Sequence, residues 1–211
     1  FFIKTVFNTS TIQFIFRVMK YYPAIKFMNW FLFIIAPCIL TEHLIANINP
    51  VAEVIEIRGE VNLQPAVMDR LPGPAIAGRS IYNGDILHSA LGSQLQLQFA
   101  AADIRVTATG ISELRIDCNH EGCYIKLNYG NLFLESSSNN NDKFSVLTKY
   151  GEVILHDNEI WMTRSMTSKD KIYSIKGAVT IIPTMSTKQH IEAGERFSIN
   201  SDGEISIDKI S

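Results

Sequence analysis

The sequence predicts an all-β fold, namely an antiparallel sandwich, roll or jelly-roll-like domain that follows an N-terminal apolar leader. Two observations predict the β domain. From residue 51 on, apolar and polar residues alternate in short runs, and no run of ten or more residues has the period of an amphipathic helix. A skewed composition predicts the leader, because 11 of the 21 aromatic residues lie in the first 50 positions whereas all 12 glycines follow residue 58.

Residues 1–46 resemble a signal for export. Phe27–Leu40 contains 14 residues of which only Asn29 is polar, and Lys20 and Lys26 precede it. This length suits the apolar part of a secretory signal peptide, whereas a bilayer-spanning helix needs about 20 residues. We therefore expect the rest of the chain to be periplasmic or exported.

The fate of the leader has three interpretations. In the first, translation starts at Met19 and a peptidase cleaves after Ala46, which leaves residues 47–211 as a free exported domain. In the second, Tyr21–Thr41 remains in the inner membrane as a signal anchor, with the C-terminal domain outside the cytoplasm. In the third, which the residues favour least, the apolar run is a buried helix of a cytosolic fold.

Charge and length limit the function of residues 47–211. These 165 residues suffice for one domain with a substantial core. They carry 15 Lys and Arg against 20 Asp and Glu, which gives a net charge of about −5. A negative domain repels phosphate backbones, so the composition excludes a strongly basic nucleic-acid-binding protein.

The alternating runs predict a series of short strands. In the clearest run, Leu95, Leu97 and Phe99 alternate with three glutamines. We expect residues 65–78, which contain several prolines, to form a loop, and the polar residues 136–142 to form a linker within one domain. Turn signals occur at residues 83–85, 90–92, 109–110, 193–194 and 202–203. The predicted strands occupy residues 51–57, 59–63, 94–99, 104–108, 114–116, 124–127, 132–134, 144–146, 153–155, 172–175, 179–181, 197–199 and 205–207.

Two cysteines of the domain, Cys118 and Cys123, flank the turn-forming residues 119–122 between two predicted strands. This spacing places both thiols at the end of a hairpin, where a disulfide is geometrically possible. Two free thiols and a metal site with His120 are the alternatives. The metal site is the least favoured, because these residues supply three ligands and a structural zinc ion needs four.

Several strand-and-turn segments follow one another between residues 51 and 207. They are Gly78–Leu87, Ser89–Phe99, Ser112–Ile116, Leu127–Leu132, Phe144–Thr148, Ile175–Val179 and Ile191–Glu195. In this order they resemble the FecR domain family, an exported sensory module named for the ferric-citrate regulator. The chain departs from the family pattern at two places. Residues 102–106 lack the glycine that the family has in this segment, and residues 157–161 stand where the family has a turn of small residues.

The resemblance implies a protein-binding module that relays a signal in the bacterial cell envelope. Family members typically have a cytoplasmic domain that binds a sigma factor, one membrane span and this domain in the periplasm. Because 26 residues precede Phe27, we expect the sigma-factor-binding arm to be absent here. The expected partner is an envelope protein that adds a strand to an exposed sheet edge. Contact with the membrane is expected only through the leader, if it stays uncleaved.

No set of residues predicts catalysis, and we therefore expect a protein that is not an enzyme and has no cofactor or metal. The sequence contains no strained nucleophile turn and no phosphate-binding glycine loop. Asp85 is expected to be a turn carboxylate that accepts hydrogen bonds from nearby amides. The histidines, at positions 43, 88, 120, 156 and 190, lack the spacing of metal ligands.

Two other functions remain open. One is a lipid-binding jelly-roll of the lipopolysaccharide-transport type, and the other is a hydrolase on a β scaffold. A filled interior would favour the relay module, and an open apolar groove would favour lipid binding. Aromatic residues could line a sugar- or partner-binding surface or simply belong to strand faces; they are Tyr124, Tyr129, Tyr150, Trp161 and Tyr173.

Overall fold

Among the residues that the structure describes, every regular element of this computed structural model is a β-strand, which confirms the predicted all-β fold. The structure describes residues 49–99, 103–120, 122–136, 144–166 and 169–210, so the leader and most of segment 136–142 lie outside it. None of the described segments is a helix long and apolar enough to cross a membrane. The strands are β1 (Ala52–Arg58), β2 (Val61–Gln64), β3 (Gly73–Pro74), β4 (Ser80–Ile81), β5 (Ile86–Ser89), β6 (Gln94–Phe99), β7 (Ile104–Asn119), β8 (Gly122–Ser136), β9 (Phe144–Leu147), β10 (Gly151–Leu155), β11 (Glu159–Arg164), β12 (Lys169–Lys176), β13 (Val179–Pro183), β14 (Gln189–Ile191), β15 (Glu195–Asn200) and β16 (Ile205–Lys209).

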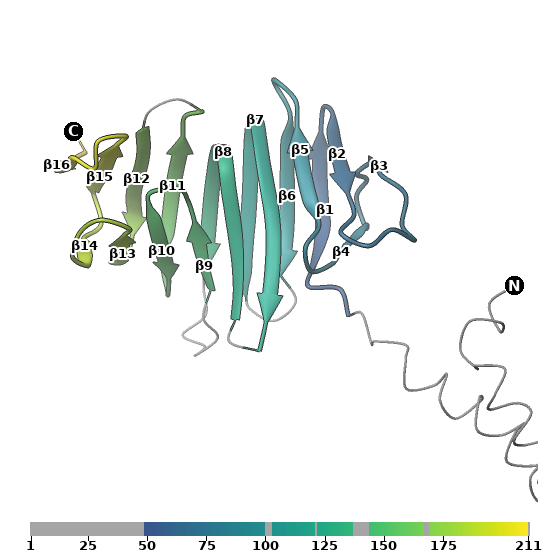
Figure 1. Ribbon diagram of the computed structural model, residues 1–211, viewed down its shortest axis with the longest axis horizontal. Coiled ribbons are helices and arrows are strands. Elements are labelled where there is room, and N and C mark those ends of the chain that lie inside the picture. The colour runs from purple at the N-terminus through teal and green to yellow at the C-terminus, as the bar shows by residue number, and fades with distance from the viewer. Residues whose placement is uncertain (1–48, 100–102, 121, 137–143, 167–168, 211) are drawn as a thin grey trace, which may run out of the picture. The chain divides into compact units, whose positions relative to one another are not determined.

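A long antiparallel hairpin, β7–β8, lies in the middle of the molecule (Figure 1). Its register runs from Ile104 opposite Ser136 to Asn119 opposite Gly122. The first half of β7 pairs with β6 and its second half with β5. In the same way, the second half of β8 pairs with β11 and its first half with β9. Each long strand therefore belongs to two layers of sheet.

The two layers follow from these pairings. The first layer has the order β4-β1-β6-β7-β8-β11-β12-β15-β16, and the second has the order β3-β2-β5-β7-β8-β9-β10-β13-β14. All pairings between the described strands are antiparallel except that of β8 with β9. That pair is parallel because β8 ends in the first layer at Ser136, and β9 begins in the second layer beside Cys123, near the start of β8.

Glycines allow the long hairpin to bend from one layer into the other. Gly110 in β7 and Gly130 in β8 have φ angles of 68° and 119°, which side chains disfavour. The register shifts at this point, between the pair at Thr109 and the pair at Glu113. The turn expected at residues 109–110 is therefore wrong: the glycine bends one continuous strand instead of ending it, because β8 bends beside it.

The same correction applies to the neighbouring predictions. The runs 104–108 and 114–116 belong to one strand, β7, and the runs 124–127 and 132–134 belong to β8. Residues 65–78 form a loop as expected, apart from the two-residue strand β3. That strand pairs with β2 at the edge of the second layer, where a proline is tolerated.

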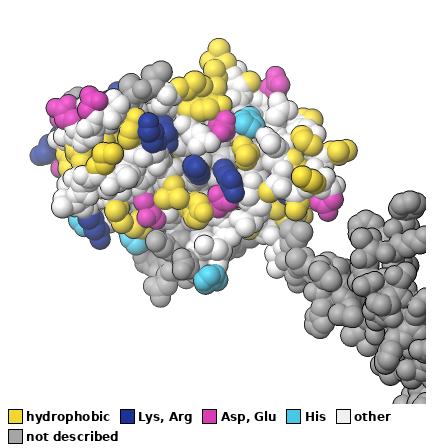
Figure 2. Space-filling model, viewed as in Figure 1, with side chains coloured by type: hydrophobic (Ala, Val, Ile, Leu, Met, Phe, Trp, Pro, Cys, Tyr) yellow, Lys and Arg dark blue, Asp and Glu magenta, His cyan; other side chains and the backbone are white. Residues whose placement is uncertain are grey.

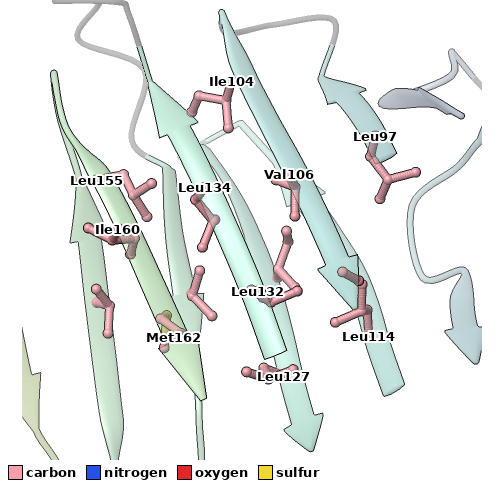
Figure 3. Packing of buried hydrophobic residues seen from close by; sticks show 14 of the residues in the cluster. Leu97, Ile104, Val106, Leu114, Leu127, Leu132, Leu134, Leu155, Ile160 and Met162 are labelled. Carbon is pink, nitrogen blue, oxygen red and sulfur yellow. The ribbon is translucent and has the colours of Figure 1, made fainter. Parts of the chain in front are cut away.

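The inner faces of the two layers form one apolar core. Side chains of β7, β8, β10 and β11 lie together in it (Figure 3). Phe99 of the first layer meets Phe144 of the second edge-to-face, with ring centroids 4.8 Å apart. Burying each such side chain contributes about 1.5–3 kcal/mol. The largest fully buried side chains are Phe144, Phe197, Leu63, Ile81, Leu87, Leu95, Leu97, Leu114, Ile116, Ile125, Leu127 and Leu132. The core is therefore filled by the alternating residues of the strands.

Gly130→Ala is expected to lower the free energy of unfolding by about 3 kcal/mol or more, because strain and overpacking add. A Cβ atom at Gly130 would meet the side chain of Ser112 and lie 2.7 Å from its Cα atom. Gly92→Ala is the matched control, since Gly92 has a φ of 75° but no atom within 4 Å of the added Cβ. This control should lose only about 1–2 kcal/mol. Equal losses in denaturant titrations would contradict the proposed bend.

Candidate interaction site

Cys118 and Cys123 form a disulfide, as the first of the three interpretations predicts. Their Cα atoms lie 4.1 Å apart as a cross-strand pair at the end of the β7–β8 hairpin. The backbone amide of Cys118 donates a hydrogen bond of 2.7 Å to the side-chain oxygen of Asn83. The bonded sulfurs exclude the free-thiol and zinc interpretations in this state.

Two of the described histidines have side-chain partners. His88 faces Glu113 at 3.4 Å, and the ring of His190 lies 3.2 Å from the hydroxyl of Thr180. Within the described ranges, no three His, Cys, Asp or Glu residues gather in a geometry that could hold a metal ion. His43 lies outside these ranges.

The aromatic residues do not form one surface. Trp161 lies opposite Phe133 of β8 and Tyr173 of β12 on the outer face of the first layer, and its ring lies 6.4 Å from that of Phe133. The indole N–H of Trp161 donates to the hydroxyl of Thr163 at 3.1 Å. Tyr124, in contrast, lies on the outer face of the second layer.

A cross-strand ladder continues from Trp161 to the end of the first layer. Tyr173 lies opposite Arg196 of β15, and Arg196 lies opposite Asp208 of β16. The guanidinium of Arg196 donates to the carboxylate of Asp208 at 2.8 Å, which raises the pKa of Arg196. Phe133, Trp161, Tyr173, Arg196 and Asp208 thus form what we call the outer ladder, which reaches β16.

The strand β16 pairs with β15 on one side only among the described residues. The amide of Ile210 donates to Gly194 and the carbonyl of Glu204 accepts from Asn200, at 2.7 and 3.2 Å. Backbone groups of successive strand residues point in opposite directions. The amides and carbonyls that point away from β15 are therefore those of Ile205, Ile207 and Lys209.

Ile207 gives this open edge an apolar character. It lies opposite the buried Phe197, and therefore on the inner side of the sheet, but it remains 42% exposed. The edge at the other end of the same layer is covered. There Val54 donates to Arg79 and accepts from Gly78, so a loop and β4 occupy the outer side of β1. An open backbone edge with an exposed apolar side chain is a site where another strand can pair.

A shallow groove of about 680 Å³ lies on the outer face of the second layer. It continues into a smaller hollow of about 200 Å³ beside the disulfide. Its lining contains both charged and apolar groups, and both kinds also occur over the face seen in Figure 2. Its lining includes Arg115, Asp117, Tyr124, Lys126, Leu147, Glu152 and Ile182. This is a surface groove with a mixed polar and apolar lining and not an opening into the apolar core.

A buried ion pair lies between the layers. Nε of Arg164 lies 3.8 Å from a carboxylate oxygen of Asp170, which is 1% exposed, and another guanidinium nitrogen donates to the carbonyl of Leu127 at 2.8 Å. Burial raises the pKa of Asp170 and outweighs the opposite effects of the Thr148 hydroxyl and of Arg164. Both members of the pair are enclosed by the fold, so we assign the pair a structural role.

Comparisons with known proteins support the fold of the chain and nothing more specific. No family model matches the chain, and no curated protein matches it. Two crystal structures of a protein from Parabacteroides distasonis, described as a candidate anti-sigma factor, are similar to it with a TM-score of 0.53 and 14% sequence identity. Each match covers 59% of this chain and 59% of the other, which is less than two thirds of either.

Reduction of the disulfide is expected to lower the free energy of unfolding by about 2 kcal/mol, the value for a loop this short. Denaturant titrations with and without dithiothreitol measure the effect. The double variant Cys118→Ser/Cys123→Ser should not respond to the reductant, whereas Cys38→Ser should respond like the wild type. A response that survives in the double variant would assign the effect to another bond.

Asp170→Asn is expected to change how stability depends on pH. Because the pKa of Asp170 is raised above its unfolded value of 3.8, the folded protein holds this proton more tightly. The free energy of unfolding therefore falls as the pH rises from the unfolded pKa through the folded pKa. Relative to the Asn variant, the wild type should lose stability as the pH rises above about 3.8. A difference that stays constant or rises in urea titrations would contradict this assignment.

Proposed function

We propose that the chain is an exported, non-catalytic module of the FecR type that binds an envelope protein and relays a signal. The observation that carries this proposal is the open edge of β16, which offers backbone groups and an exposed isoleucine at one end of a filled sandwich. The likeness in fold to a candidate anti-sigma factor supports a regulatory role. The order of the FecR-like segments supports the family.

Strand addition gives this edge a defined binding mode. A partner strand would pair with the outward backbone groups of Ile205, Ile207 and Lys209, and main-chain hydrogen bonds would supply affinity. Its alternate side chains would lie beside Ile207 on the inner side and beside Asp208 on the outer side. An extended segment with apolar residues at every second position fits this edge best, because Ile207 then loses contact with water.

Export of the domain is part of the same proposal. The apolar run Phe27–Leu40 supports it, because this run has the length and the preceding lysines of a secretory signal. The disulfide supports it too, since disulfides persist in oxidising compartments such as the periplasm. We place the domain in the periplasm, either free or tethered to the inner membrane by the leader.

The filled interior favours the relay module over lipid transport. Aliphatic side chains from both layers occupy the space that a lipid chain would need. The described hollows lie on the outer face and contain charged groups, which suit a protein surface better than an acyl chain. We therefore propose no lipid-binding function for the interior.

Ile207→Pro is expected to abolish partner capture while leaving the domain folded. Proline removes an amide that points away from β15, so no hydrogen bond within the domain is lost, but a partner strand loses its central donor. Ile207→Ala is the matched control, because it also loses the isoleucine side chain yet keeps the amide. Affinity capture from envelope extracts, followed by mass spectrometry, compares both variants with the wild type.

The two variants distinguish strand addition from other binding modes. A protein that the wild type and Ile207→Ala retain, and that Ile207→Pro loses, supports pairing at β16. Equal retention by both variants would place the partner elsewhere on the surface. Failure of the wild type to capture any envelope protein would refute the relay function.

A further inference from the structure

The loop between β2 and β4 exposes a group of large apolar side chains. Val67, Met68, Leu71 and Ile76 are 38, 103, 82 and 63% exposed. Figure 2 shows hydrophobic side chains gathered at the end of the molecule where Figure 1 places β3. Single exposed apolar residues are common on soluble proteins, but a contiguous group marks a contact surface. We call residues 65–78 the apolar loop.

The apolar loop is held in place by Asp85, whose side chain is fully buried. The carboxylate of Asp85 accepts hydrogen bonds of 3.0 Å from the backbone amides of Ala66 and Tyr82. The guanidinium of Arg70 donates to both carboxylate oxygens and lies 4.3 Å from the centre of the Tyr82 ring. This agrees with the expectation that Asp85 is a turn carboxylate, and adds an arginine partner that sequence reasoning missed.

This clamp has two consequences for the loop. First, it fixes both sides of the exposed Val67 and Met68, because Ala66 and Arg70 are bound to the same carboxylate. Second, it neutralises the charge of Arg70, so Asp69 is the one unpaired charge that the loop carries among residues 65–78. The clamp therefore presents apolar side chains to the exterior on a fixed frame.

The path of the chain indicates which surface the loop meets. The amide of Val51 donates to the carbonyl of Ile81 in β4, so the chain enters the domain beside the strand that ends the loop region. Residues 41–51 separate this point from the apolar run Phe27–Leu40. Eleven residues span at most about 40 Å when fully extended. If the apolar run lies in a bilayer, this end of the domain stays within about 40 Å of the bilayer surface.

We propose that the apolar loop inserts its exposed side chains into the interface of the phospholipid bilayer that holds Phe27–Leu40. Apolar side chains on a rigid loop gain free energy when they enter the boundary between headgroups and acyl chains. The loop then fixes the orientation of the domain, with the β3 end against the membrane and the β16 edge at the far end. This inference is independent of strand addition, which concerns the opposite end of the molecule.

Site-specific photocrosslinking tests the proposal with the full chain, including residues 1–46, reconstituted into vesicles of phosphatidylcholine and phosphatidylglycerol. A benzophenone amino acid replaces Met68 in one sample, and Leu91 or Met185 in the matched controls, which are 83 and 87% exposed. Met68 should yield about tenfold more lipid adduct than either control, since only its loop enters the interface. Equal yields at the three positions would overturn the proposal, and so would adducts of position 68 with protein instead of lipid.

A second variant separates insertion from mere proximity. Leu71→Asp adds a charge to an exposed residue of the loop and should reduce the lipid adduct at position 68 about tenfold, because a carboxylate opposes insertion. Leu91→Asp, the control, should leave the adduct unchanged, and so should Ile207→Pro. Unchanged melting temperatures verify that the variants fold. A lipid adduct that persists in Leu71→Asp would contradict insertion.

Discussion

The bend of the β7–β8 hairpin is the constraint on which the rest of the structure depends. Because both long strands continue through the bend, each supplies an edge to both layers, and every other strand is added to one of these edges. The bend requires backbone with positive φ at Gly110 and Gly130, and Ser112 lies where a side chain of residue 130 would be. These two glycines therefore allow the sixteen strands of the described residues to divide between two layers.

Much of the fold could be predicted from the sequence, because burial imposes a period of two on each strand. Leu95, Leu97 and Phe99 are all buried, as their alternation with glutamine predicts. The bend could not be predicted, since Thr109-Gly110 has the same composition as a hairpin turn. Only the partner strand decides whether the glycine ends a strand or bends it, and that partner lies far along the chain.

The candidate site was less predictable than the fold. The disulfide could be anticipated, because its two cysteines are close in sequence and their spacing fits one hairpin. The open edge could not, since Ile205 and Ile207 have the same alternation as residues of interior strands. The pairing of Arg70 with Asp85 was equally hidden: the two residues are 15 positions apart in the sequence, and only the folded loop brings them together. The open edge and the Arg70–Asp85 pair both depend on contacts between residues that are far apart in the sequence, and a local sequence pattern does not contain such contacts.

The central hairpin also bears on how the domain reaches its folded state. Contacts between β7 and β8 join residues that are close along the chain, so little entropy is lost when they form. Pairing of β1 with β6 must instead close a chain segment that includes the whole apolar loop. Low sequence separation speeds folding, which makes the hairpin the natural nucleus, with both layers growing outward from it. By this route β16 is the last strand added at its end of the first layer, and that end is the edge that remains open.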